Sequence, residues 1–114
     1  MKSQRVILDY LQDMLDACLK AIQFTQNMTF DEFIKDDKTQ FAVVRALEII
    51  GEASKKVPES LKDQNREIPW RAISGMRDKM IHDYMGINQE VVWRTVIEDL
   101  PLLGQQLQKV IEAQ

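Results

Sequence analysis

The chain has 114 residues, of which 45% are hydrophobic and 29% are charged, a balance typical of one folded domain with its own core. Its formal net charge of −3 excludes a protein that binds nucleic acid through bulk positive charge, so any such contact needs a local site. The single cysteine excludes an intrachain disulfide. The first residues lack the pattern of a secretory signal, and no apolar run approaches the roughly 20 residues that cross a bilayer. We therefore expect a single cytoplasmic domain over residues 1–114 that makes no use of a membrane.

Residues 3–26 are predicted to form the first helix, because their apolar side chains recur at spacings of three and four and so share one face. Cys18 belongs to this face and is expected to be a small buried side chain. A turn is predicted at residues 27–28, after which Thr29 and Glu32 have the spacing of a capping box that opens a short helix. The apolar face of the first helix consists of Val6, Ile7, Tyr10, Leu11, Met14, Leu15, Cys18, Leu19 and Ile22.

The next helix is predicted to be the central one of the bundle, since its apolar residues are unusually dense. It is expected to begin between residues 37 and 39 and to end near Val57, where Pro58 stops it. Gly51 lies inside this helix and indicates a close approach by another backbone, within the fold or across a dimer. The apolar residues are Phe41, Ala42, Val43, Val44, Ala46, Leu47, Ile49, Ile50 and Ala53.

The second half of the chain continues the helical pattern. Residues 58–68 are expected to form a polar connection with room for a helical turn, and Pro69 fits the first turn of a helix that ends near residues 84–86. Asn88 is a candidate N-cap of the last helix, which Pro101 is expected to kink or restart. These elements predict an all-α, up-and-down bundle of four to five helices. The buried side of the helix that follows Pro69 is predicted to consist of Trp70, Ile73, Met76, Met80 and Ile81.

The residues best suited to chemistry gather in one segment. With one histidine and one cysteine, the chain is not expected to hold a zinc site of the Cys/His type, and it contains no glycine-rich phosphate loop. His82 is therefore the only ordinary general acid or base at neutral pH. Asp78 lies four residues earlier, on the same helical face, where its carboxylate could orient the imidazole.

Arg77 completes this segment as a candidate phosphate ligand. Arg77 and Tyr84 are seven residues apart and share a helical face, but Arg77 and His82 are five apart, about 140° around an ideal helix. The arginine and the histidine could converge if the helix loosens near His82 or if a second subunit supplies part of the site. Together they suit phosphoryl transfer, with the arginine on the phosphate and the histidine moving a proton. The competing structural interpretation makes His82 a helix cap or a surface residue in a solvated, charged turn.

A second polar group lies on the central helix. Arg45, Glu48 and Glu52 follow spacings of three and four, which places them on one stripe of an otherwise apolar helix. They can form an ion-pair row that faces solvent, or they can line a cleft and buttress Arg77. Trp70 and Trp93 are interpreted as core anchors rather than as platforms for base stacking.

The motif Arg77-x4-His82-x-Tyr84 resembles the RxxxxHxY signature of HepT-like proteins, which belong to the HEPN superfamily. Residues 45–53 resemble the central helix of that family, residues 68–77 its approach to the motif, and residues 92–101 its last helix. The resemblance covers nearly the whole chain. The occurrence of these segments in this order identifies the family more specifically than the motif alone does.

The resemblance implies a HEPN-type helical bundle that forms a homodimer, in which two RxxxxH segments face a shared cleft. It implies metal-independent RNA cleavage without a cofactor, with Arg77 and His82 as the active residues. It also implies a toxin whose partner is an antitoxin of the minimal nucleotidyltransferase (MNT) type, which attaches AMP to Tyr84. The supporting residues of such a site would be Asp78, Tyr84, Arg45, Glu48 and Glu52.

Two other functions remain open at the level of sequence. One is a non-catalytic dimeric helical module that binds a nucleotidyltransferase partner or a nucleotide, an interpretation that the acidic net charge favours. The other is a purely structural bundle of the four-helix type. The intact pair of Arg77 and His82 favours the ribonuclease.

Overall fold

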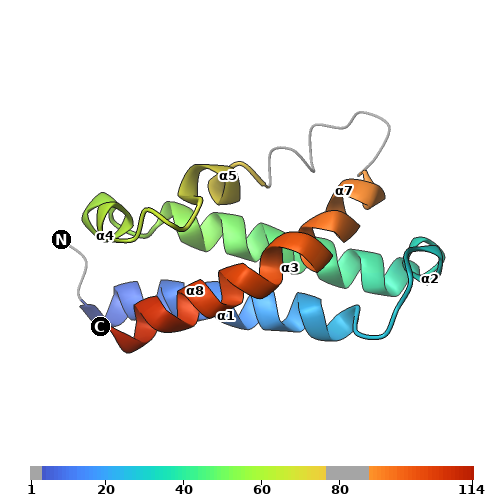
Figure 1. Cartoon of the computed structure of the whole chain (residues 1–114), viewed down its shortest axis with the longest axis horizontal. Coiled ribbons are helices and arrows are strands. Elements are labelled where there is room, and N and C mark those ends of the chain that lie inside the picture. Colours follow the sequence, from blue (N-terminus) through green and yellow to red (C-terminus); the bar gives the residue numbers. More distant parts are fainter. Residues whose placement is uncertain (1–3, 77–87) are drawn as a thin grey trace.

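The computed structural model describes residues 4–76 and 88–114, and in these ranges the regular structure is entirely helical, which confirms the all-α prediction (Figure 1). The two longest helices run antiparallel, and the C-terminal helix crosses them (Figure 1). The ends of the described chain meet, since Gln4 Nε2 donates a hydrogen bond to Gln114 Oε1 at 3.0 Å. Among the described residues, no helix combines the length and the apolar character that crossing a membrane requires.

Helix α1 spans Gln4–Phe24 and buries the centre of the predicted apolar face. It ends in a turn in which Asn27 adopts a positive φ of 62°, a conformation that asparagine tolerates better than most residues. Helix α2, Phe30–Ile34, then starts at the predicted capping box, where Thr29 and Glu32 exchange side-chain and backbone hydrogen bonds. Local sequence therefore determines both the end of α1 and the beginning of α2.

Helix α3, Asp37–Lys55, is the central helix, with α1 below it and α5 above it in the view of Figure 1. The carboxylate of Asp36 accepts from the backbone N–H of Thr39 and caps the helix, and this hydrogen bond lowers the pKa of Asp36. Gly51 is buried in α3, and the close approach of another backbone at this position stays a prediction. Phe41, one of the apolar residues that make this helix so dense, is in contrast 78% exposed.

Two short helices follow. Helix α4, Glu59–Gln64, is the predicted helical turn of the polar connection, and helix α5 spans Trp70–Ser74. Pro69 precedes α5 as its N-cap residue instead of lying in its first turn, because its ψ of 71° is not helical. Trp70 and Ile73 are buried as predicted, whereas Met80, Ile81 and the predicted end of this helix lie outside the described residues.

The last part of the chain is a helix with a widened turn in its middle. Helix α7, Gln89–Arg94, is capped by Asn88, as predicted, and leads into the π-helical turn η1, Thr95–Asp99, and helix α8, Leu100–Glu112. The N–H of Leu100 donates to the carbonyl of Thr95, five residues earlier. A helical proline lacks an N–H and crowds the carbonyl four residues before it, so the wider turn accommodates Pro101. The predicted kink or restart thus takes the form of a π turn.

Cys18 lies at a contact between α1 and α8. Its Sγ donates to the carbonyl oxygen of Leu100 at 3.2 Å, and its side chain is fully buried. The contact is possible because Gly104, one turn into α8, presents no side chain to Cys18. Leu19, the next residue of α1, is 52% exposed, so the predicted apolar face is only partly covered. Helices α3 and α8 therefore leave exposed not only the charged residues of α1 but also part of its apolar face.

We predict that Gly104→Ala stabilises the protein by about 0.5–1 kcal/mol, because alanine has the higher helix propensity. The added Cβ would lie 3.5 Å from Cys18 Sγ, an ordinary van der Waals separation. The free energy of unfolding in urea measures the change. Gly104→Val is the matched control, since its two further methyl groups overpack the contact and should cost roughly 1–3 kcal/mol. Destabilisation by alanine as well would mean that α1 and α8 pack more closely than this separation indicates.

Candidate functional site

The predicted catalytic segment lies outside the described residues. Arg77, Asp78, His82 and Tyr84 all fall within residues 77–87, so their assignments remain predictions. The structure does describe the elements on both sides of this segment. It also places Arg45, Glu48 and Glu52 on α3.

The element that precedes the segment, α5, is held against α3 by a buried polar contact. Ser54 is fully buried, and its hydroxyl lies 2.8 Å from the hydroxyl of Ser74 while donating to the carbonyl of Gly51, also at 2.8 Å. At the other end of α5, Trp70 is buried and its indole N–H donates to the carbonyl of Asn65 at 3.0 Å. The prediction that Trp70 is a core anchor is therefore confirmed. These contacts position the stretch of chain that leads into residue 77.

The element that follows the segment, α7, is held just as firmly. Asn88 Oδ1 accepts from the backbone N–H groups of Glu90 and Val91, which caps the helix. Trp93 packs against two rings of α2, with centroid separations of 6.1 Å to Phe30 and 5.2 Å to Phe33. Trp93 is thus a packing residue, as predicted. Both flanks of residues 77–87 are fixed by tertiary contacts rather than by the helices alone.

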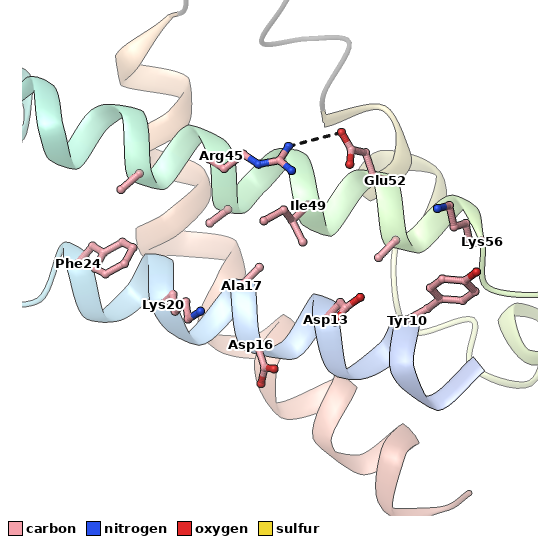
Figure 2. A pocket seen from close by; sticks show the side chains of 13 residues that line it. Tyr10, Asp13, Asp16, Ala17, Lys20, Phe24, Arg45, Ile49, Glu52 and Lys56 are labelled. Atoms are coloured by element: carbon pink, nitrogen blue, oxygen red, sulfur yellow. Dashed lines mark ion pairs between the residues drawn. The ribbon is translucent and has the colours of Figure 1, made fainter. Parts of the chain in front are cut away.

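A groove of about 580 Å³ runs between α1 and α3, and Figure 2 shows it from close by. Its floor is made of small side chains, among them Ala17, Ala46 and Ala53. Charged and aromatic side chains from the two helices form its rims (Figure 2). Among the described residues, the lining consists of Tyr10, Asp13, Asp16, Ala17, Lys20, Phe24, Ala42, Arg45, Ala46, Ile49, Glu52, Ala53 and Lys56.

The structure brings together two of the three polar residues predicted on the central helix. Arg45 Nη1 lies 3.7 Å from Glu52 Oε1 on the rim of the groove (Figure 2). Their side chains are 60% and 40% exposed, in agreement with the interpretation as a solvent-facing ion pair. Both residues also line the groove, while Glu48 is half-buried and is not part of the lining. Arg77 lies outside the described residues, so the prediction that these three residues buttress it stays a prediction.

The groove carries opposite charges in equal number. Three carboxylates and three cations from residues 4–76 line it, and this part of the lining has no excess positive charge that would attract a polyanion. Its alanine-rich floor admits a close approach by another backbone, which suits a protein helix better than a nucleic acid. The sequence analysis did not predict this groove, although the alanines spaced along the central helix, Ala42, Ala46 and Ala53, were a signal for it. The charged residues are Asp13, Asp16, Glu52, Lys20, Arg45 and Lys56.

Cys18 is not a candidate nucleophile. Burial raises the pKa of its thiol to about 11, an effect opposed in part by a hydrogen bond from the backbone of Gly104. A buried thiol with a raised pKa is almost fully protonated at neutral pH and does not react. The expectation that Cys18 is a small buried side chain is confirmed.

Comparisons with known proteins find ribonucleases of one family over most of the chain. A family model described as "Ribonuclease HepT-like" matches residues 14–110. A probable ribonuclease HepT of Thermococcus cleftensis is 50% identical over 102 residues, which are 90% of this chain and 93% of that protein. A putative RNase of Methanocaldococcus jannaschii is 45% identical over 103 residues, which are 90% of this chain and 85% of that protein. A putative RNase of Caldanaerobacter subterraneus is 38% identical over 103 residues, which are 90% and 92% of the two chains. No solved structure matches the chain at a significant level.

We predict that Glu52→Gln lowers the free energy of unfolding by less than about 1 kcal/mol, because the ion pair with Arg45 is exposed to solvent. Urea unfolding of Glu52→Gln, Arg45→Gln and the double variant gives the coupling between the two side chains, expected at about 0.2–1 kcal/mol. Glu98→Gln, an exposed carboxylate on η1, is the matched control. A loss above about 2 kcal/mol in Glu52→Gln alone would place its carboxylate in a buried network instead.

Proposed function

The chain belongs to the HepT-like ribonuclease family, and from this premise we propose that it is an endoribonuclease toxin that cleaves RNA with Arg77 and His82. The observation that carries the proposal is the extent of the family match. It covers residues 14–110 and so includes the whole Arg77-x4-His82-x-Tyr84 motif. The relatives named as ribonucleases are similar over the same length, which supports an endoribonuclease activity for this chain.

The proposed reaction is attack of a ribose 2′-hydroxyl on the adjacent phosphate. A bond forms between the 2′-oxygen and phosphorus, and the bond to the 5′-oxygen of the next nucleotide breaks. His82 takes the proton from the 2′-hydroxyl or gives one to the leaving 5′-oxygen. Arg77 holds the phosphate and stabilises the charge that develops on it. The products are a 2′,3′-cyclic phosphate and a 5′-hydroxyl end, so no water is consumed in this step.

We assign supporting roles to the neighbouring polar residues. Asp78 orients His82, since the two are one helical turn apart in the sequence. Arg45, Glu48 and Glu52 support the cleft from the central helix. The half-buried position of Glu48 and the ion pair between Arg45 and Glu52 are compatible with this role.

A homodimer completes the proposal. An ideal helix separates Arg77 and His82 by about 140°, so one straight helix does not direct both at a single phosphate. Two segments that face each other across a dimer axis would place an arginine and a histidine around a shared cleft. The groove between α1 and α3 is a candidate contact surface, because its charges balance and a second copy would offer the same pattern.

The proposed partner is an MNT-type nucleotidyltransferase that silences the toxin at Tyr84. The phenolic oxygen of Tyr84 attacks the α-phosphorus of ATP, pyrophosphate leaves, and the phenolic proton passes to a base of the partner. The AMP phosphate then lies in the same segment as Arg77 and can pair with its guanidinium. The arginine becomes less available to the RNA backbone, and the adenosine obstructs the cleft.

We predict that Arg77→Ala and His82→Ala each lower RNA cleavage at least about 100-fold, because each removes a group that acts in the transition state. The purified, unmodified protein should cleave single-stranded RNA in EDTA, and light scattering of the same sample should give the mass of a dimer. Cleavage is followed on a labelled RNA by gel electrophoresis, with the 2′,3′-cyclic end identified by mass spectrometry.

The control for charge loss is Arg5→Ala, which removes an exposed arginine from the first turn of α1. It should cleave as the unchanged protein does. Glu48→Gln and Glu52→Gln test the supporting role, which requires a loss of cleavage without a matching loss of stability. Full activity in both Arg77→Ala and His82→Ala, or activity that disappears in EDTA, would refute the mechanism.

We predict that co-expression with an MNT-type nucleotidyltransferase adds one or more AMP units to Tyr84 and abolishes cleavage. Intact-mass and peptide mass spectrometry locate the modification. The chain has two tyrosines, so Tyr10→Phe is a matched control that should still be modified, whereas Tyr84→Phe should not. A silenced protein with an unmodified Tyr84 would show that the partner inhibits by covering the cleft instead.

A further inference from the structure

Helices α4 and α5 enclose a second pocket, of about 710 Å³, on a different part of the surface from the groove between α1 and α3. We propose that this pocket binds the phosphate backbone of the RNA substrate through Arg66 and Arg71. The inference rests on the proposed ribonuclease function and adds a substrate-binding subsite to it. The lining consists of Glu59, Lys62, Asp63, Arg66, Pro69, Trp70, Arg71 and Ser74.

The charges of this pocket differ from those of the groove. Three cations and two carboxylates among the described residues line it, which gives a local excess of positive charge in a chain whose net charge is −3. Lys62 is engaged, with its ammonium 3.9 Å from Glu59 Oε1 and 5.9 Å from the centre of the Trp70 ring. Arg66 and Arg71 are exposed, and neither has an ion-pair partner within the part of the chain that the structure describes. Two guanidinium groups are thus available for phosphate oxygens, to which they can bind in a bidentate manner.

The burial of Trp70 decides which part of the RNA the pocket can contact. Only 8% of its surface is exposed, and its N–H already donates to the carbonyl of Asn65. It therefore cannot stack on a base, and within the part of the chain that the structure describes no other aromatic residue lines the pocket. The available groups recognise phosphate rather than base edges, so this subsite should bind RNA without regard to sequence.

The position of the pocket connects it to the proposed chemistry. Ser74 lines the pocket and is only three residues before Arg77 in the sequence, a length of chain that spans at most roughly 11 Å. The hydrogen bond between the hydroxyls of Ser54 and Ser74 holds this wall of the pocket against α3. A phosphate bound by Arg66 and Arg71 would place a neighbouring part of the same RNA strand near the predicted catalytic arginine.

The test compares two double variants that lose the same charge. Arg66→Gln/Arg71→Gln removes the two pocket arginines, and Arg5→Gln/Lys109→Gln removes two exposed cations from α1 and α8, below α3 in the view of Figure 1. Both are made in a His82→Ala background, and binding of a labelled single-stranded RNA is followed by fluorescence anisotropy at several salt concentrations. The pocket variant should lose about 10-fold to 100-fold in affinity, and the slope of log Kd against log salt should fall by about 1.4, the value for two lost phosphate contacts.

The control variant should retain the affinity and the salt slope of its parent. Arg66→Lys/Arg71→Lys should keep the slope, because the charges remain, but recover only part of the affinity. With His82 present, the pocket variant should raise KM and leave kcat nearly unchanged. Circular dichroism verifies that the helices are intact in every variant.

Equal losses in the two double variants would overturn the proposal, since bulk charge would then explain them. Unchanged RNA binding in the pocket variant would overturn it as well and would leave the two arginines to an acidic protein partner. A protein that binds RNA through the pocket but cleaves none would retain this inference and refute the proposed ribonuclease function. Absence of any RNA binding would refute the inference by itself.

Discussion

Helices α1 and α3 bury the faces that they turn toward each other, and the other elements depend on this contact. Leu11 and Met14 of α1 and Leu47 and Ile50 of α3 are fully excluded from solvent. Each such side chain contributes about 1.5–3 kcal/mol when it is removed from water, so the pair forms the main part of the core. Helices α2, α5 and α7 contact α3, while α8 packs on α1. The two elements that border the predicted catalytic segment, α5 and α7, therefore both rest on the helix that α1 holds in place.

The central position of α3 explains how a small bundle can hold both flanks of the predicted catalytic segment. Ser54 on α3 holds Ser74 at the end of α5 through a partly buried contact between their hydroxyls. On the other side of the segment, Trp93 of α7 packs on the rings of α2, which itself rests on α3. The elements on both sides of residues 77–87 are thus held, directly or through α2, by the same helix, α3. That arrangement suits a site whose arginine and histidine come from one short stretch of chain.

The two surface hollows differ in the chemistry that they offer. The groove between α1 and α3 has a floor of small side chains and balanced charges, which suits a helical protein surface. In the described part of the chain, the pocket between α4 and α5 offers two exposed guanidinium groups and a Trp70 ring that is buried, which suits a phosphate backbone. An acidic chain can in this way bind RNA locally without a basic surface overall. The proposed dimer contact and the proposed RNA contact would then occupy separate surfaces and would not compete.

The sequence by itself determined the features that depend on neighbouring residues in the chain. The capping box at Thr29, the cap at Asn88 and the interruption at Pro101 are local signals, because a helix ends where its own N–H and C=O groups lose partners. The motif of Arg77 and His82 was also read from the sequence, and its roles remain predictions. Only the tertiary structure decided which side chains of an apolar face are covered, since helical periodicity gives a direction but not the neighbour that lies there. Phe41 and Leu19 fit the pattern and are exposed, while Glu52 rather than Glu48 pairs with Arg45. The groove between α1 and α3, which are separated in the sequence by α2, became visible only when these helices were packed together.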